Sequence, residues 1–138
     1  MCGFVGFLSA GPWVRDEAGR ELLVRMANAI VHRGPDSAGY WRDETGIALG
    51  HRRLSILDLS PAGHQPMHSV CGRYVLAFNG EIYNHLDLRR ELEGASAISS
   101  WRGHSDTETL LAGFVSWGIR ATVERCIGMF ALAVWDKK

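Results

Sequence analysis

Apolar residues recur at helical spacing in four parts of the chain. In Arg20–Val31 they recur every three or four positions, and Gly34 with Pro35 then ends the predicted helix. Ser105 and Glu108 form a capping-box pattern ahead of Leu110, Leu111, Phe114 and Trp117. The other two predicted helices are His85–Glu93, with Asn84 as the cap and Asp87 three positions on, and Ile119–Arg125.

Short apolar runs bounded by turn-forming residues predict strands. The predicted strands are Cys2–Leu8, Ala38–Trp41, Ile47–Arg53, Tyr74–Phe78, Ala97–Trp101 and Met129–Trp135. Asn79–Gly80, which follows the fourth strand, suits a tight turn, and Ser60–Ser69, with its prolines and glycine, is predicted to be a loop. Because strands come in neighbouring groups between a few helices, the pattern favours an α+β sandwich over a strictly alternating parallel sheet.

The composition narrows the class of protein. Of the 138 residues, 46% are hydrophobic, and 15 basic side chains balance 15 acidic ones. This suits one compact domain and argues against a disordered chain or a bulk nucleic-acid or membrane binder. An odd number of widely spaced cysteines suits a reducing compartment, and no stretch approaches the roughly 20 apolar residues of a membrane helix. We therefore expect a cytoplasmic protein that binds neither nucleic acid nor membrane.

Cys2 is the sharpest candidate for chemistry. Removal of Met1 would leave Cys2 with a free α-amine, so one residue could supply both a nucleophilic thiol and a general base. In model peptides a cysteine thiol has a pKa of ~8.5 and an α-amine has a pKa of ~8, so the amine is a base of suitable strength for a thiol. The alternative is that Cys2 is a small buried hydrophobe at the start of a strand.

Three further positions could complete a site for acyl transfer on an amino acid. The side-chain amide of Asn79 and the N–H of Gly80 could both point at one developing oxyanion, although a hairpin turn is the simpler interpretation of this dipeptide. Arg53 could hold a carboxylate and Asp106 an ammonium. Taken singly, Arg53 suits a surface charge and Asp106 a helix cap.

Other kinds of site have weaker support. His64, His68 and Cys71 could all ligate zinc, but a fourth ligand is not evident nearby, so exposed loop histidines are favoured over a metal site. The sequence contains no phosphate-binding glycine loop and no G-x-S-x-G element of serine hydrolases.

Six segments in order carry a resemblance to a known family: MCGFVGF at 1–7, HRGPD at 32–36, HRRLSI at 51–56, NGEIYN at 79–84, SDTE at 105–108 and GMFA at 128–131. Over essentially the whole chain they resemble the glutaminase domain of class II glutamine amidotransferases. Pro35 in the second segment, and Glu81-Ile82-Tyr83 in the fourth, are similar to the asparagine synthetase branch of that family.

The resemblance implies the fold of the N-terminal-nucleophile hydrolases, a four-layer αββα sandwich with two antiparallel sheets. It also implies that residues 2–138 are an incomplete glutaminase domain, because a further segment and an ATP-using synthetase domain are expected after Lys138. We therefore expect no cofactor or metal in this chain, with ATP and magnesium belonging to the synthetase domain.

The resemblance also implies roles for the candidate residues. Cys2 would be the nucleophile and its amine the base, with Asn79 and Gly80 as the oxyanion hole. Arg33 and Gly34 would support the loop near Cys2. The substrate L-glutamine would be bound by Arg53, by main-chain groups of Ile56 and Leu57, and by Asn79, Gly80, Glu81 and Asp106.

The implied reaction is hydrolysis of the glutamine side-chain amide to glutamate and ammonia through a thioester on Cys2, as the ammonia-supplying half of an asparagine synthetase. The synthetase domain would be the partner, and a homodimer stays open. Two alternatives also stay open: amidation of another carboxylate, in a polysaccharide or natural product, and a non-catalytic interaction module that keeps the fold.

Overall fold

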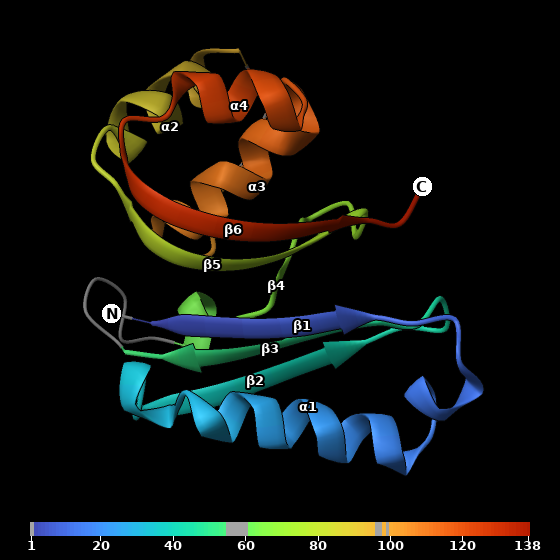
Figure 1. Ribbon diagram of the computed structural model, residues 1–138. Helices are drawn as coiled ribbons and strands as arrows, with labels where there is room; N and C mark the ends of the chain where they lie inside the picture. The colour runs from blue at the N-terminus through green and yellow to red at the C-terminus, as the bar shows by residue number, and fades with distance from the viewer. Residues whose placement is uncertain (1, 55–60, 96–97, 99) are drawn as a thin grey trace.

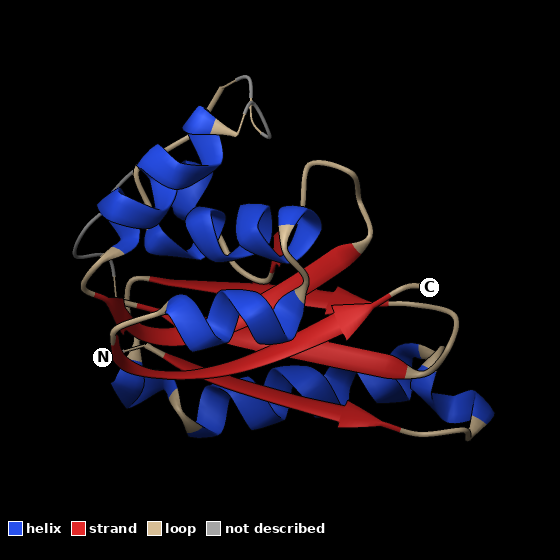
Figure 2. Cartoon of the chain, turned by 90° about the horizontal axis from the view of Figure 1, so that it is seen from above, coloured by secondary structure: helices blue, strands red, loops and turns tan. Residues whose placement is uncertain are grey.

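The computed structural model describes residues 2–54, 61–95, 98 and 100–138. These residues form four stacked layers, with α1 (Glu17–Ala29) outside one three-stranded sheet and three helices outside the other: α2 (His85–Gly94), α3 (Asp106–Ser116) and α4 (Ile119–Arg125) (Figure 1). Every strand pair is antiparallel. The predicted α+β class and αββα layering are therefore confirmed. In Figure 2 the two ends of the chain lie at opposite ends of the strands.

The first sheet has the strand order β1-β3-β2. Its strands are β1 (Gly3–Leu8), β3 (Ile47–Arg53) and β2 (Ser37–Arg42). All three were predicted, and β2 is one residue longer at each end than expected. The register places Gly3 opposite Arg52, so the beginning of β1 lies beside the end of β3. Cys2 and Arg53, far apart in the sequence, are thereby brought to the same end of this sheet.

The second sheet has the strand order β4-β5-β6. Its strands are β4 (Met67–His68), β5 (Tyr74–Ile82) and β6 (Gly128–Asp136). The expectation of a loop over Ser60–Ser69 is wrong in two places, because the segment contains β4 and a 3₁₀ turn, η3 (Pro61–Gly63); Ser60 itself lies outside the described residues. The Ser69 N–H donates to the Tyr74 carbonyl at 3.0 Å and closes a hairpin between β4 and β5.

The hairpin turn expected at Asn79–Gly80 is also wrong, because β5 continues through both residues to Ile82. β6 pairs with β5 along its whole length, and Gly80 lies opposite Phe130. The turn that does form comes earlier, between β4 and β5, where Gly72 has a φ of 73°. Pairing with a strand almost fifty residues away therefore overrides the local turn preference of the dipeptide.

Helix α1 (Glu17–Ala29) begins three residues before the predicted start and ends before the predicted end. Asp16 occupies the N-cap position and Glu17 adds negative charge to the first turn, where the helix dipole favours it. A 3₁₀ turn, η1 (Pro12–Val14), precedes α1, and another, η2 (Val31–Arg33), follows it. The buried Leu23 and Ala27 are one turn apart, so they share the face that packs on the first sheet.

The helices outside the second sheet are α2 (His85–Gly94), α3 (Asp106–Ser116) and α4 (Ile119–Arg125). Ser105 caps α3 as predicted, because its hydroxyl accepts from the Glu108 N–H. Asn84 does not cap α2 through its side chain. Its amide instead donates to the Arg125 carbonyl and accepts from the Ile127 N–H, which joins the start of α2 to the link between α4 and β6.

A strand was predicted at Ala97–Trp101. Ala97 and Ser99 lie outside the described residues, and Ile98, Ser100 and Trp101 belong to no strand. Trp101 packs on α2 instead. The guanidinium of Arg89 lies 4.1 Å from the centre of a Trp101 ring, and the indole N–H donates to Glu93 at 2.6 Å. Trp101 is therefore an aromatic residue that packs on a helix, and its apolar character does not indicate a strand.

The main core lies between the second sheet and its helices. Its fully or nearly buried members are Met67, Tyr74, Leu76, Phe78, Ile82, Leu88, Leu110, Leu111 and Phe114. Alternate residues of β5 supply four of them, as expected for a strand with one face on a helical layer. No helix in the described part of the chain is long and apolar enough to cross a membrane.

Two helical glycines give a matched test of this packing. A Cβ added at Gly113 would lie 2.5 Å from Thr122 Cγ2 on α4, whereas one added at Gly94 meets nothing within 4 Å. Alanine is the better helix former by roughly 0.5–1 kcal/mol. We expect Gly94→Ala to stabilise the protein by up to that amount and Gly113→Ala to destabilise it by about 1–3 kcal/mol. Urea denaturation measures both, and equal effects would contradict the close packing of α3 on α4.

Candidate functional site

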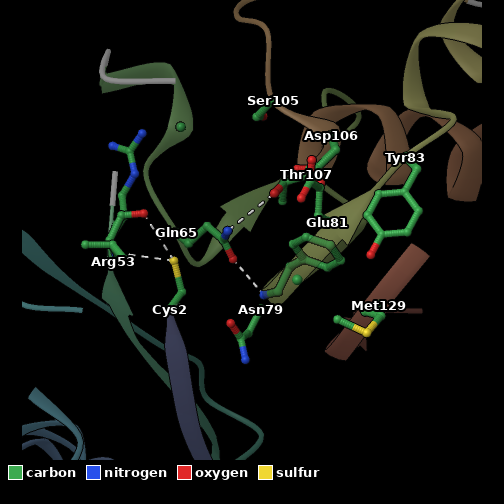
Figure 3. Close-up of a pocket in the computed structure, with 14 residues that line it drawn as sticks. Cys2, Arg53, Gln65, Asn79, Glu81, Tyr83, Ser105, Asp106, Thr107 and Met129 are labelled. Carbon is green, nitrogen blue, oxygen red and sulfur yellow. Dashed lines mark hydrogen bonds between the residues drawn. The ribbon is translucent and has the colours of Figure 1, made fainter. Parts of the chain in front are cut away.

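A cavity of about 220 Å³ opens where the ends of the two sheets meet. Figure 3 shows Cys2 and Arg53 on one side, Glu81, Asp106, Tyr83 and Met129 on the other, and Gln65 and Asn79 between them. The lining residues are Cys2, Arg53, Leu54, Gly63, Gln65, Phe78, Asn79, Gly80, Glu81, Tyr83, Ser105, Asp106, Thr107 and Met129. The structure thus places Cys2, Arg53, Asn79, Gly80, Glu81 and Asp106 around one cavity.

Cys2 precedes β1 and is held at the edge of this cavity. Its Sγ accepts from the Leu54 N–H at 3.3 Å and lies 3.5 Å from the Leu54 carbonyl. The guanidinium of Arg33 donates to the Cys2 carbonyl at 3.4 Å. Gly34 lies so close to the backbone of Arg52 and Arg53 that no Cβ would fit there. Because Cys2 is only half-buried and faces the cavity, its thiol is accessible to a ligand.

The backbone of β5 directs the Gly80 N–H away from β6. In an antiparallel pair, successive residues point their backbone groups alternately to the two sides of the strand. The Tyr83 N–H points toward β6, where it donates to the Ile127 carbonyl, and the Phe78 and Ile82 N–H groups point away from β6, to Gln65 and Asp106. Gly80 lies midway between Phe78 and Ile82 along β5, so its N–H also points away from β6, on the side of the strand where the cavity lies.

Asn79 is the neighbour of Gly80 on β5 and lines the same cavity as Cys2 (Figure 3). Its Oδ1 is buried and has no hydrogen-bond partner among the described residues. The same amide also carries the two Nδ2 N–H donors, which are the groups that a ligand oxyanion would need. At Gly80 a Cβ would collide with the Met129 carbonyl and with Phe130 on β6, so only glycine allows β5 and β6 to approach this closely here.

Asp106 is the first residue of α3 and is 5% exposed. Ser105, not Asp106, provides the cap, and the Asp106 carboxylate instead accepts from the Ile82 N–H at 3.0 Å. Burial raises the pKa of Asp106, while hydrogen bonds from Ile82 and Thr107 oppose that rise. A buried carboxylate at a helix N-terminus is suited to an ammonium ligand.

The remaining predicted residues differ in how far the structure describes them. Arg53 ends β3, is half-buried and lines the cavity opposite Asp106. Glu81, on β5, also lines the cavity but is exposed. Ile56 and Leu57, expected to contribute main-chain groups, lie outside the described residues.

Gln65 is a cavity residue that the sequence analysis missed. Its side chain is 7% exposed, its Oε1 accepts from the Phe78 N–H at 2.6 Å, and its Nε2 donates to the Thr107 hydroxyl at 3.3 Å. It therefore ties the segment before β4 to both β5 and α3. A polar residue in a segment predicted as loop carries no signal of burial, so only the structure shows this role.

His51 was also missed as a site residue, although it lies in one of the six segments. It is 1% exposed on β3, and its Nε2 lies 3.0 Å from the Phe78 carbonyl. Because a carbonyl only accepts, Nε2 carries the proton, and the buried Nδ1 has no partner among the described residues. Burial is the main cause that lowers the pKa of His51 to about 4.

His64, His68 and Cys71 do not gather as a metal site would require. The His68 ring meets Trp41 edge-on, and the Cys71 Sγ lies 3.5 Å from the Ser69 hydroxyl. His64 is exposed. Nowhere in the described part of the chain do three His, Cys, Asp or Glu side chains group closely enough to hold a metal ion.

Comparisons with known proteins agree with this geometry. The family model "Glutamine amidotransferase domain" matches residues 1–138. The chain is 43% identical over 99% of its length to asparagine synthetase [glutamine-hydrolyzing] 1 of Bacillus subtilis (strain 168), of which it covers 21%. It is 36% identical over its whole length to asparagine synthetase [glutamine-hydrolyzing] 3 of the same organism, of which it covers 22%. The chain belongs to the glutamine amidotransferase domain family.

Two further findings set the scope of this assignment. The chain is 34% identical over 99% of its length to amidase chry2 of Gibberella zeae, of which it covers 21%. It thus spans about a fifth of the length of the curated relatives it matches, with shares of 21% and 22%. The family assignment therefore concerns the domain, and the reaction of a whole protein requires a separate argument.

The depressed pKa of His51 predicts a loss of stability in acid. Between the ordinary pKa of 6.5 and the folded pKa of about 4, the unfolded state binds a proton that the folded state does not, so the free energy of unfolding falls as the pH falls. From pH 7 to pH 4 the expected loss from His51 alone is about 3 kcal/mol. Urea denaturation across this range measures it.

His51→Gln, which keeps a donor but does not titrate, should remove this part of the pH dependence. Thr122→Val is the control. It deletes a hydroxyl that donates to the Gly118 carbonyl at 2.7 Å and should lower stability equally at every pH. If His51→Gln kept the full wild-type pH dependence, the assignment of a neutral buried imidazole would be wrong.

Proposed function

We propose that this domain hydrolyses the side-chain amide of L-glutamine to glutamate and ammonia through a γ-glutamyl thioester on Cys2. The observation that carries the proposal is that Cys2, Asn79 and Gly80 line one cavity. A nucleophile and two oxyanion donors around one space are what acyl transfer requires. Membership of the glutamine amidotransferase domain family supports the choice of substrate.

The proposed reaction begins once removal of Met1 has freed the α-amine of Cys2. The amine takes the thiol proton, and the sulfur attacks the amide carbon and forms a C–S bond. Asn79 and the Gly80 N–H stabilise the oxyanion. The C–N bond then breaks, and the nitrogen takes the proton from the amine and leaves as ammonia. Water attacks the thioester, with the amine again accepting a proton, and breakage of the C–S bond releases glutamate and restores the thiol.

Recognition of the amino-acid end of glutamine is assigned to the charges on the cavity wall. Arg53, on the first sheet, is suited to the α-carboxylate because a guanidinium can donate two parallel hydrogen bonds. Asp106, at the start of α3, is suited to the α-ammonium. Both side chains line the cavity that contains Cys2. A zwitterion placed between them would be oriented with its side chain directed at the thiol.

The reaction that a longer protein containing this domain would catalyse is proposed from the names of the longer relatives. The named asparagine synthetases favour ammonia supply to ATP-dependent asparagine synthesis, with ATP and magnesium bound by a synthetase domain that would be the partner of this one. Amidase chry2 matches the same region, so another carboxylate acceptor stays a second candidate. Cytoplasmic location and a homodimer stay predictions from the sequence.

Substitution of the nucleophile tests the proposed chemistry. Cys2→Ala should abolish glutamine hydrolysis, and Cys2→Ser should lower kcat by more than about 100-fold because a hydroxyl is the weaker nucleophile here. The measurement is glutamate release from L-glutamine by protein whose N-terminus has been checked by mass. Cys71→Ser is the matched control, since Cys71 is exposed and lies outside the cavity. Wild-type turnover by Cys2→Ala would refute the proposal, whereas absence of turnover by the wild-type protein would favour a non-catalytic module.

Neutralising Asp106 tests the ammonium site. Asp106→Asn keeps an acceptor for the Ile82 N–H but removes the charge, so KM for glutamine should rise by roughly 10- to 100-fold while kcat changes less. Wild-type protein should prefer L-glutamine to 4-carbamoylbutanoate, which lacks the ammonium, and Asp106→Asn should lose most of that preference. Asp87→Asn, an exposed carboxylate on α2, should change neither value. An unchanged preference in Asp106→Asn would remove Asp106 from substrate recognition.

A further inference from the structure

β5 loses its neighbour on one side within the second sheet. β4 is two residues long and pairs only with Val75 and Leu76. Beyond that point the backbone groups of Phe78, Gly80 and Ile82 face away from β6 with no strand beside them in the described part of the chain. Buried backbone groups without partners are costly, so side chains must take the place of the missing strand.

Two side chains hold the backbone of Phe78 at this edge. Its N–H donates to Gln65 Oε1 at 2.6 Å, and its carbonyl accepts from His51 Nε2 at 3.0 Å. Both side chains are more than nine-tenths buried. The peptide that joins Phe78 to Asn79 contains this carbonyl, so its orientation is set by His51. The Asn79 side chain leaves the chain directly after this peptide, and the Gly80 N–H belongs to the next peptide along β5.

His51 is also a polar link between the two sheets at the cavity. It lies on β3 in the first sheet, two residues before Arg53 and three before Leu54, whose N–H contacts the Cys2 thiol. The Phe78 carbonyl that it binds belongs to the second sheet. A second link, from the Trp135 indole to Asp43 at 3.1 Å, lies near the opposite end of β5. The contact of His51 therefore joins the strand that leads to Leu54 and the Cys2 thiol with the strand that contains Asn79 and Gly80.

From this geometry we propose that His51 and Gln65 are positioning residues, which align the Asn79 amide and the Gly80 N–H with the Cys2 thiol. Neither residue need touch the substrate. The inference rests on the proposed glutaminase function and goes beyond it by assigning the alignment of the oxyanion donors to two named contacts. Misplacement of such donors lowers the rate of the chemical step more than it lowers the affinity for substrate.

The test compares variants that remove one contact at a time. His51→Phe keeps a ring but removes the donor, and it should lower kcat for glutamine hydrolysis by roughly 10- to 100-fold with KM within about threefold. His51→Gln, which can still donate to the Phe78 carbonyl, should recover most of kcat. Gln65→Met keeps the side-chain length but removes the acceptor for the Phe78 N–H, and it should resemble His51→Phe.

Two probes separate alignment from general damage. L-Glutamate γ-semialdehyde adds to the thiol to form a tetrahedral oxygen-bearing adduct, so its inhibition constant should rise with the loss in kcat, while that of L-glutamate should not change. Alkylation of Cys2 by iodoacetamide forms no oxyanion and should keep its wild-type rate. Thr122→Val is the control for stability, because it weakens a buried contact on α4, away from the cavity, and should leave kcat unchanged.

The outcomes distinguish this inference from the proposed function. A folded His51→Phe with wild-type kcat and semialdehyde affinity would overturn the inference, as would a rise in KM with kcat unchanged or a parallel loss of alkylation rate. If His51→Phe does not fold, the same readouts on Gln65→Met decide. Full activity of these variants beside an inactive Cys2→Ala would refute only the inference, whereas an active Cys2→Ala would refute both.

Discussion

The edge of β5 that no strand covers in the described part of the chain is the constraint on which the site depends. β4 covers only the first part of β5, and a buried backbone group left without a partner costs about 1–3 kcal/mol. Gln65, His51 and Asp106 supply the missing partners at Phe78 and Ile82. They come from a connecting segment, from the other sheet and from a helix. The hydrogen bonds that the backbone of this strand edge requires therefore bring a connecting segment, the other sheet and a helix together around Gly80.

The charges follow from the same arrangement. Asp106 can stay in a buried position because the Ile82 N–H and the start of α3 stabilise its carboxylate against the burial that raises its pKa. Arg53 lies across the cavity at the end of β3. The cavity thus has a cationic and an anionic wall, each held by regular structure, which is the charge arrangement that the proposed zwitterionic substrate requires.

Features with a local cause were predictable from the sequence, and those with a distant cause were not. The periodic apolar positions located α1, and the cap at Ser105 located the start of α3. The pairing of Asn79–Gly80 with β6 was not predictable, because the partner strand lies almost fifty residues away and its influence exceeds the turn preference of the dipeptide. The cavity-lining residues that carry charge or a thiol were singled out by their chemistry. Gln65 and His51 were missed because their partners are backbone groups of another strand, which leave no pattern in the sequence.

The division of the site between the two sheets has a consequence for the folding chain. The thiol is fixed by contacts within the first sheet, through Leu54, whereas the oxyanion donors belong to the second. A partly folded chain with only one sheet formed has either the nucleophile or the groups that stabilise its adduct, but not both. Under the proposed function, the nucleophile and the groups that stabilise its adduct therefore come together only when the two sheets dock.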